Sequence, residues 1–288
     1  MPDLTNNRII RAFAELRNSG KKTVLPFITA GYPDLETTAA LLGEFQARGV
    51  RICELGIPFS DPVADGPIIQ ASYTEALARG VHSDGIFEMV RRFRAAALKS
   101  EIPDLQSEIS NLKSPLAIIA MVSYSIVYRH DPKVYLADAA AAGFDGLIIP
   151  DLPLEEAGEL EPIAAANGLC NIMLIAPTTA PDRRAEIARH SRGFIYYVSV
   201  AGITGERTRL PEATIAAVAE LRRHTDTPVC VGFGVSSPET VARVCAVADG
   251  AIVGSAIVHR ITDAKDAPRA KLVAAVGEFV GQLLAPVK

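Results

Sequence analysis

A closed (β/α)8 barrel is the fold class that this sequence of 288 residues predicts, and three observations favour it. Eight short apolar runs recur along the chain, and helical patterns lie between them. The runs are continuously apolar, as is typical of strands buried on both faces. Eight strand–helix repeats fit one closed barrel, with an open doubly wound sheet as the alternative fold.

The expected elements follow in chain order. A first helix over residues 5–18 carries Ile9, Phe13 and Leu16 on one face, and we expect it to cover the barrel floor. The eight expected strands are residues 24–29, 51–55, 116–122, 146–149, 170–175, 194–198, 228–231 and 250–253. The helices expected between them and after them are residues 35–48, 132–142, 154–166, 181–190, 211–223, 238–247 and 268–284.

The step between the second and third strands is about twice as long as the other steps. It has room for helices near residues 68–78 and 84–98, followed by a polar tract at 99–113 with the spacing of a further short helix. We therefore expect one TIM-barrel domain over residues 1–288, with an extra N-terminal helix and a long, insertion-bearing segment between strands 2 and 3.

Composition excludes several classes of function. The net charge is -4 and basic residues do not cluster, which argues against nucleic-acid binding. The four cysteines are scattered and the histidines lack metal-ligand spacing, so we expect buried thiols and no metal. The sequence shows no secretory leader and no apolar span of membrane length, which predicts a soluble cytoplasmic protein.

The stretch ELGIPFSDPVADGP, residues 54–67, contains the best acid–base candidates. Glu54 ends an apolar run, so its pKa is expected to be raised by its surroundings. Asp65 follows a loop stiffened by prolines, which can fold back over the mouth of the barrel. Asp61 precedes Pro62 and can be a simple turn residue, and for Asp151, which precedes Leu152-Pro153, turn formation is favoured over catalysis.

A phosphate site is expected where strands 7 and 8 end. Glycines there, with Gly234 and Gly254 among them, allow backbone N–H groups to approach a ligand. A helix beginning at Ser255 would direct its N-terminal dipole at an anion. Gly205 follows Thr204 in a loop whose glycines suggest a mobile lid over the same side.

These segments together resemble the tryptophan synthase alpha chain family. The resemblance rests on ELGIPFSDPVADGP and on PFITAGYPD (26–34), PDLPLEE (150–156), YYVSVAGITG (196–205), VGFGVSSPE (231–239) and GAIVGSAIV (250–258). It covers nearly the whole chain in the family's order. It implies retro-aldol cleavage of indole-3-glycerol phosphate to indole and glyceraldehyde 3-phosphate, without a cofactor. It also implies a beta chain partner that carries pyridoxal phosphate, in an α2β2 assembly.

The resemblance implies a role for individual residues. Glu54 matches the general acid/base, Asp65 the carboxylate that binds the indole N–H, and Tyr196 the active-site tyrosine. Phe27 matches an aromatic residue of the indole pocket, and Asp61 a loop aspartate that communicates with the beta chain. The remaining matches are the lid residue Thr204 and the phosphate contacts Gly205, Gly234, Gly254 and Ser255.

One departure from the family pattern keeps alternatives open. The sequence reads Tyr124-Ser125-Ile126 where members often read Tyr-Asn-Pro, on the side expected to meet the beta chain. A stand-alone lyase of the same fold is therefore one alternative to a tryptophan synthase subunit. A barrel kept mainly as an allosteric binding subunit is a second, which intact Glu54 and Asp65 disfavour.

Overall fold

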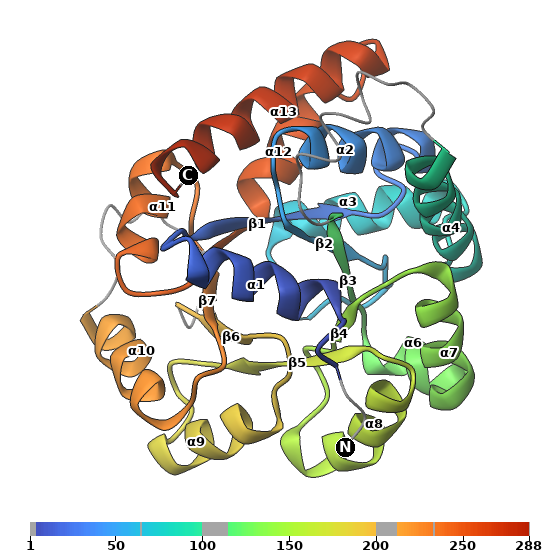
Figure 1. The fold of residues 1–288 in the computed structure, drawn as a ribbon. Coiled ribbons are helices and arrows are strands. Elements are labelled where there is room, and N and C mark those ends of the chain that lie inside the picture. Colours follow the sequence, from blue (N-terminus) through green and yellow to red (C-terminus); the bar gives the residue numbers. More distant parts are fainter. Residues whose placement is uncertain (1–3, 64, 100–114, 200–211, 233, 288) are drawn as a thin grey trace.

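The computed structural model describes residues 4–63, 65–99, 115–199, 212–232 and 234–287, and its strands form a closed parallel barrel. Each strand pairs with the next one in the sequence, and β8 pairs with β1. The predicted (β/α)8 fold is thus confirmed (Figure 1). The strands are β1 (Thr23–Thr29), β2 (Ile52–Gly56), β3 (Ala117–Met121), β4 (Gly146–Ile148), β5 (Cys170–Ile175), β6 (Ile195–Val198), β7 (Val229–Gly232) and β8 (Gly250–Val253).

Burial of the strands explains their continuous apolar sequences. All residues of β1, β2 and β3 are buried, and the same holds for β4, β7 and β8. One face of each strand fills the barrel interior while the other packs under the helices, so neither face selects polar residues. Glu54 in β2 is an ionisable residue within this apolar sequence, and it too is fully buried.

The outer helices lie close to the predicted ranges. They are α2 (Leu35–Ala47), α3 (Pro67–Ala78), α4 (Ser83–Lys99), α6 (Tyr124–Arg129), α7 (Pro132–Ala142), α8 (Leu154–Ala166), α9 (Pro181–His190), α10 (Glu212–His224), α11 (Pro238–Cys245), α12 (Ser255–Ala264) and α13 (Arg269–Leu284), with a final 3-10 turn at Ala285–Val287. Helix α6 was not predicted. It begins where Ser123 accepts a hydrogen bond from the backbone N–H of Ser125, a cap that satisfies a donor of the first turn.

Helix α1 (Arg8–Asn18) lies across the floor of the barrel, as the apolar face of this segment predicted (Figure 1). It begins three residues later than expected because Asn7 caps it and accepts from the N–H of Ile9 at 2.9 Å. The Asn7 amide also donates to the carbonyls of Asp145 and Gly168, which precede β4 and β5. Helix α1 is therefore fixed to the amino-terminal ends of the strands, opposite the edge where a site is expected.

The long segment between β2 and β3 contains helices α3 and α4, close to the predicted ranges. The polar tract 99–113, with its expected short helix, lies outside the described residues apart from its first residue. Of the two described helices, α3 has the closer relation to the barrel mouth, because it follows directly on the loop that contains Asp61 and Asp65.

Within the described residues, one helical stretch, Arg269–Val287, is long and apolar enough to cross a membrane by length and composition alone. Its apolar side is covered by protein: Leu272, Val276 and Leu283 are buried, and α13 packs against α2 and α12. Figure 1 shows α13 lying along these helices at the outside of the barrel. This is the environment of a core helix in a folded domain.

Candidate active site

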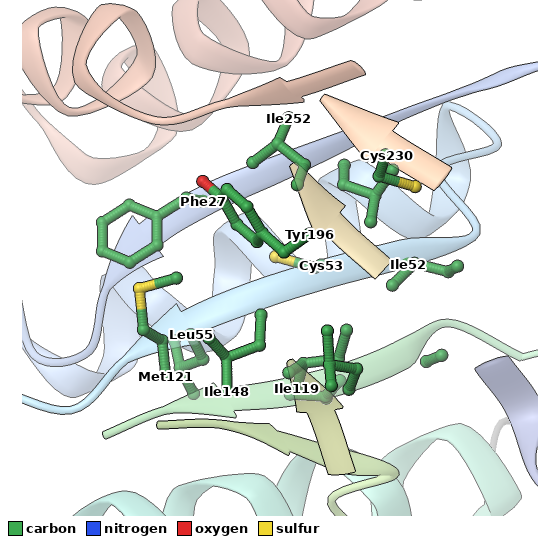
Figure 2. Packing of buried hydrophobic residues seen from close by; sticks show 14 of the residues in the cluster. Phe27, Ile52, Cys53, Leu55, Ile119, Met121, Ile148, Tyr196, Cys230 and Ile252 are labelled. Carbon is green, nitrogen blue, oxygen red and sulfur yellow. The ribbon is translucent and has the colours of Figure 1, made fainter. Parts of the chain in front are cut away.

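The carboxyl ends of the strands form the mouth of the barrel, and side chains from several strands converge there. Figure 2 shows Phe27, Met121 and Tyr196 projecting into the interior from β1, β3 and β6. Glu54 joins them from β2, where its α-carbon is in register with Phe27 of β1 and with Ile119 of β3. The structure therefore brings together Glu54, Phe27 and Tyr196, which are far apart in the sequence.

Glu54 is fully buried, and neither carboxyl oxygen has a hydrogen-bond partner among the described residues. Burial raises the pKa of this carboxyl well above its usual value, as the sequence predicted. A buried carboxyl without donors favours its protonated form, because no group compensates the cost of burying the charge. The arrangement provides a carboxylic acid whose proton can be delivered to a bound molecule.

Tyr196 extends its ring across the interior towards β7. A Cβ on Gly232 would lie 2.5 Å from the Tyr196 hydroxyl oxygen, so the absence of a side chain at 232 makes room for this hydroxyl. Burial raises the pKa of Tyr196 well above its usual value, and the nearby charges of Glu54 and then Asp65 raise it further. Tyr196 consequently remains a neutral hydroxyl, able to donate a hydrogen bond.

Asp65 lies in the loop between β2 and α3, and its backbone N–H and carbonyl groups both make hydrogen bonds. Its N–H donates to the carbonyl of Pro62 at 3.1 Å, and its carbonyl accepts from the Gln70 side chain at 2.8 Å. Burial raises the pKa of the Asp65 carboxyl to about 6. This carboxyl is therefore mostly ionised at neutral pH.

A cleft opens beside this loop. Its lining includes Asp65, Asp61, Tyr73, Met121, Ser123 and Asp151. Asp61 is exposed at its outer edge. Asp151 accepts hydrogen bonds from the Ser123 hydroxyl at 2.7 Å and from the N–H of Tyr124 at 2.8 Å. The structure thus favours a structural role for Asp151 over a catalytic one, because its hydrogen bonds hold the start of α6.

Phe27 fills the gap between β2 and β8. A Cβ on Gly56 would lie 2.5 Å from the tip of its ring, and a Cβ on Gly254 would lie 3.5 Å from the ring edge. The ring thus forms an apolar wall between the Glu54 side of the mouth and the start of α12. A flat aromatic ligand would find a complementary surface at this position.

The expected phosphate site lies at the start of α12, where β8 ends. Gly254 is the N-cap residue and has no side chain to cap the helix. Ser255 begins the helix and is exposed. Gly234 has a positive φ of +76°, and no atom lies within 4 Å of the place where its Cβ would be. Backbone N–H groups at a helix start beside open space suit an anion. Thr204 and Gly205 lie outside the described residues.

Comparison with known proteins decides the family. A model of the tryptophan synthase alpha chain family matches residues 13–285. This chain belongs to that family. The alpha chain of Rhodopirellula baltica is 44% identical over 252 residues, which are 88% of this chain and 86% of that protein. The alpha chain of Geobacter sulfurreducens is 42% identical over 96% of this chain and 99% of its own.

Solved structures agree with this assignment. The crystal structure of tryptophan synthase subunit alpha from Legionella pneumophila is similar, with a TM-score of 0.82 and 33% identity over 98% of both chains. Tryptophan synthase alpha chains are lyases that act on indole-3-glycerol phosphate in tryptophan biosynthesis, and this chain is an enzyme of that class. In the described part of the chain, no three His, Cys, Asp or Glu side chains are placed to hold a metal ion.

Sequence reasoning missed two residues that lie at this barrel mouth, Gly56 and Tyr73. Gly56 ends β2, and its missing side chain admits both the Phe27 ring and the Tyr73 hydroxyl, which would lie 2.6 Å from a Cβ at 56. Tyr73 comes from α3 and is 3% exposed. Its position eight residues after Asp65, within the helix predicted near residues 68–78, was the available signal, but a helical position alone does not show that a side chain reaches the barrel mouth.

Proposed function

We propose that this chain cleaves the carbon–carbon bond of indole-3-glycerol phosphate with Glu54 as its general acid and base. The observation that carries the proposal is the Glu54 carboxyl itself, fully buried at the barrel mouth and without hydrogen-bond partners among the described residues. A carboxyl in this environment begins the reaction protonated. Bond cleavage requires such a proton, because the C3 carbon of indole leaves only after it is protonated.

The Glu54 carboxyl group carries out both proton transfers, delivering one proton and accepting another. Glu54 delivers its proton to C3 of the indole ring, and the ring becomes a cationic indolenine. The Glu54 carboxylate then accepts the proton of the glycerol hydroxyl beside the breaking bond. The electrons of the O–H bond form the aldehyde, and those of the C–C bond return to the ring. Indole and glyceraldehyde 3-phosphate leave, and Glu54 regains its proton.

Asp65 supplies a negative charge next to the positive charge that develops on the indole ring. With its pKa raised to about 6, Asp65 is ionised at neutral pH and can accept the hydrogen bond of the indole N–H. Positive charge develops at that nitrogen when C3 is protonated, so a fixed carboxylate stabilises the transition state more than the ground state. The Tyr196 hydroxyl lies near both carboxyl groups and, in this proposal, donates to the reacting end of the substrate.

The substrate spans the mouth from Phe27 to the start of α12. In this proposal the indole ring stacks against Phe27, and the phosphate binds N–H groups at Gly234, Gly254 and Ser255, with Gly205 and the lid residue Thr204 closing the same side. The open space at Gly234 and the uncapped start of α12 support this orientation. The alpha reaction then needs no cofactor of its own.

The partner in this proposal is a tryptophan synthase beta chain, which carries pyridoxal phosphate, in an α2β2 assembly. Val63 and Tyr128 support it, because these large apolar side chains are 80% and 68% exposed. Val63 belongs to the loop between Asp61 and Asp65, and α6 with Tyr128 begins at Ser123 in the same cleft. Apolar groups exposed next to a site suit a protein interface. In this proposal the exposed Asp61 communicates across that interface.

We further propose that the whole chain is one barrel domain working in the cytoplasm, where tryptophan is made. An indole-release assay tests the proposed function. Wild-type protein should release indole from indole-3-glycerol phosphate, and Glu54→Gln should not. Indole release by this variant at the wild-type rate would exclude Glu54 as the acid.

Adding a tryptophan synthase beta chain to the same assay separates the remaining alternatives. Strong stimulation by the beta chain supports the subunit role. Full activity without it supports a stand-alone lyase, and negligible activity under both conditions supports a binding subunit. The exposed side chains of Val63 and Tyr128 favour the subunit role among these three.

A further inference from the structure

Tyr73 has no role in the mechanism above, yet its hydroxyl reaches the barrel mouth from outside the barrel. The ring comes from α3, which is held to β1 by a hydrogen bond of 2.6 Å between the hydroxyls of Ser72 and Thr29. The Tyr73 oxygen would lie 2.6 Å from a Cβ on Gly56, two residues beyond Glu54 on β2. A phenol from an outer helix thus lies next to the tip of Phe27, at the expected indole end of the site.

The Tyr73 hydroxyl has no hydrogen-bond partner among the described residues, although the residue is only 3% exposed. Burial raises the pKa of this hydroxyl, and the charges of Asp65 and then Glu54 raise it further. The group therefore stays protonated and available as a donor.

The Asp65 carboxylate is the complementary group. Its backbone is fixed by Pro62 and Gln70, but its side chain accepts no hydrogen bond from any residue in the described ranges. Asp65 and Tyr73 line the same cleft. An ionised carboxylate in a partly buried cleft is stabilised strongly by a hydroxyl donor.

Tyr73 and Tyr196 both lie near Glu54 and Asp65, and each tyrosine is affected more strongly by a different one of these carboxyl groups. For Tyr73 the nearby charge with the larger effect is Asp65, whereas for Tyr196 it is Glu54. Tyr196 does not line the cleft that contains Asp65. We propose that the Tyr73 hydroxyl donates a hydrogen bond to the ionised Asp65 carboxylate and positions it against the indole N–H. This inference rests on the proposed function, and it makes Tyr73 a positioning residue.

The proposal predicts a change in the titration of Asp65. The titratable groups that face this carboxyl are Glu54 on β2, Tyr73 on α3, Tyr196 on β6, and Asp61 and Asp151 around the cleft. A donor to the carboxylate lowers the pKa of Asp65, so removing the donor raises it. Because one pKa unit corresponds to a tenfold change in the ionisation equilibrium, a rise of about one unit would cut the ionised fraction about fivefold at the pH that equals the wild-type pKa.

The test is Tyr73→Phe, followed by two measurements on the full-length chain. An NMR titration of 13C-carboxyl-labelled aspartate, with the Asp65 signal assigned by Asp65→Asn, should report a pKa about one unit higher than in wild type. The acidic limb of kcat/KM should move upward by the same amount, with a loss of about fivefold at the wild-type midpoint and a much smaller loss at pH 8.

Tyr135→Phe is the matched control. Tyr135 is also a fully buried tyrosine, but its ring packs against Phe87 between outer helices and its hydroxyl lies beside Ser83. This control should leave the Asp65 titration unchanged. An unchanged pKa of Asp65 in Tyr73→Phe would overturn the positioning role. A loss of kcat/KM that is equal at all pH values would overturn it as well.

The two proposals fail in different ways. The NMR titration does not depend on turnover, so it reports on Tyr73 and Asp65 even if the chain cleaves no substrate. Full activity of Glu54→Gln would instead refute the catalytic assignment and leave the titration result intact.

Discussion

Gly232 and Tyr196 are complementary across two neighbouring strands: a Cβ at residue 232 would lie 2.5 Å from the tyrosine hydroxyl oxygen and 2.9 Å from two of its ring carbons. The contact lies at the end of β7, one strand away from β6, which contains Tyr196. The position of the Tyr196 side chain therefore depends on a residue with no side chain.

Gly232→Ala is expected to displace Tyr196 and to impair catalysis. Inserting a methyl group into packed surroundings costs about 1–3 kcal/mol of unfolding free energy, and a shift of about 1 Å at a reacting group reduces kcat/KM about 100-fold. Gly250→Ala is the control, because its Cβ would meet Leu25 at 2.8 Å and Cys230 at 2.9 Å on the floor side of β8. It should lose similar stability while its folded fraction keeps wild-type kcat/KM. Equal loss of activity in both variants would refute a specific role for Gly232.

Glu54→Gln should abolish indole release without unfolding the protein. General acid–base groups contribute about 100- to 10,000-fold to the rate, so kcat should fall by at least that factor. The same variant should flatten the pH dependence of stability. Because the folded state raises the pKa of Glu54, folded protein holds a proton that unfolded protein releases above pH 4.5. Wild-type stability therefore falls as pH rises above this value, by up to about 1.4 kcal/mol per pH unit for this group.

Urea unfolding of wild type and of Glu54→Gln between pH 5 and 8 measures this difference. The gap in stability between the two should change with pH in favour of the variant as pH rises. A constant gap across the range would mean that Glu54 does not titrate differently in the folded and unfolded states.

The pH profile of kcat/KM should be bell-shaped. Asp65 must be ionised, so activity is expected to fall below pH 6, near the raised pKa of this carboxyl. Glu54 must be protonated, so activity should also fall as pH rises through its elevated pKa. The second ionisation of the substrate phosphate also lies at a pH of about 6. Asp65→Asn separates the two, since any acidic limb that persists in this variant belongs to the substrate.

Gly234→Val should weaken substrate binding. A side chain at 234 would enter the open space proposed for the phosphate, and loss of a hydrogen bond to a charged group raises KM about tenfold or more. Gly20→Val is the control because Gly20 also has a positive φ, +66°, and also has no atom within 4 Å of its Cβ position. Both variants should show similar backbone strain, about 1–2 kcal/mol. An unchanged KM in Gly234→Val would argue against a phosphate site there.

Several elements could be predicted because they depend on local pattern. Continuous apolar runs predicted the strands, and the burial of a lone Glu54 in such a run predicted its raised pKa. Helix α6 escaped prediction because its start depends on Asp151, which is 28 residues from Ser123 in the chain. The alpha chain family assignment rested on motifs that a single sequence already contains.

By itself the sequence determined the eightfold alternation of strands and helices and the family, and it singled out Glu54 and Asp65 as acid–base candidates, because these depend on periodicity and on short motifs. Only the tertiary structure decided which groups surround each carboxyl. Gly56, Tyr73 and Gly232 act through distances between elements that the chain order does not specify. The physical reason is that closure of the barrel places residues from β1, β2 and β6 in one water-poor interior, and burial there separates the pKa of Glu54 from that of Asp65.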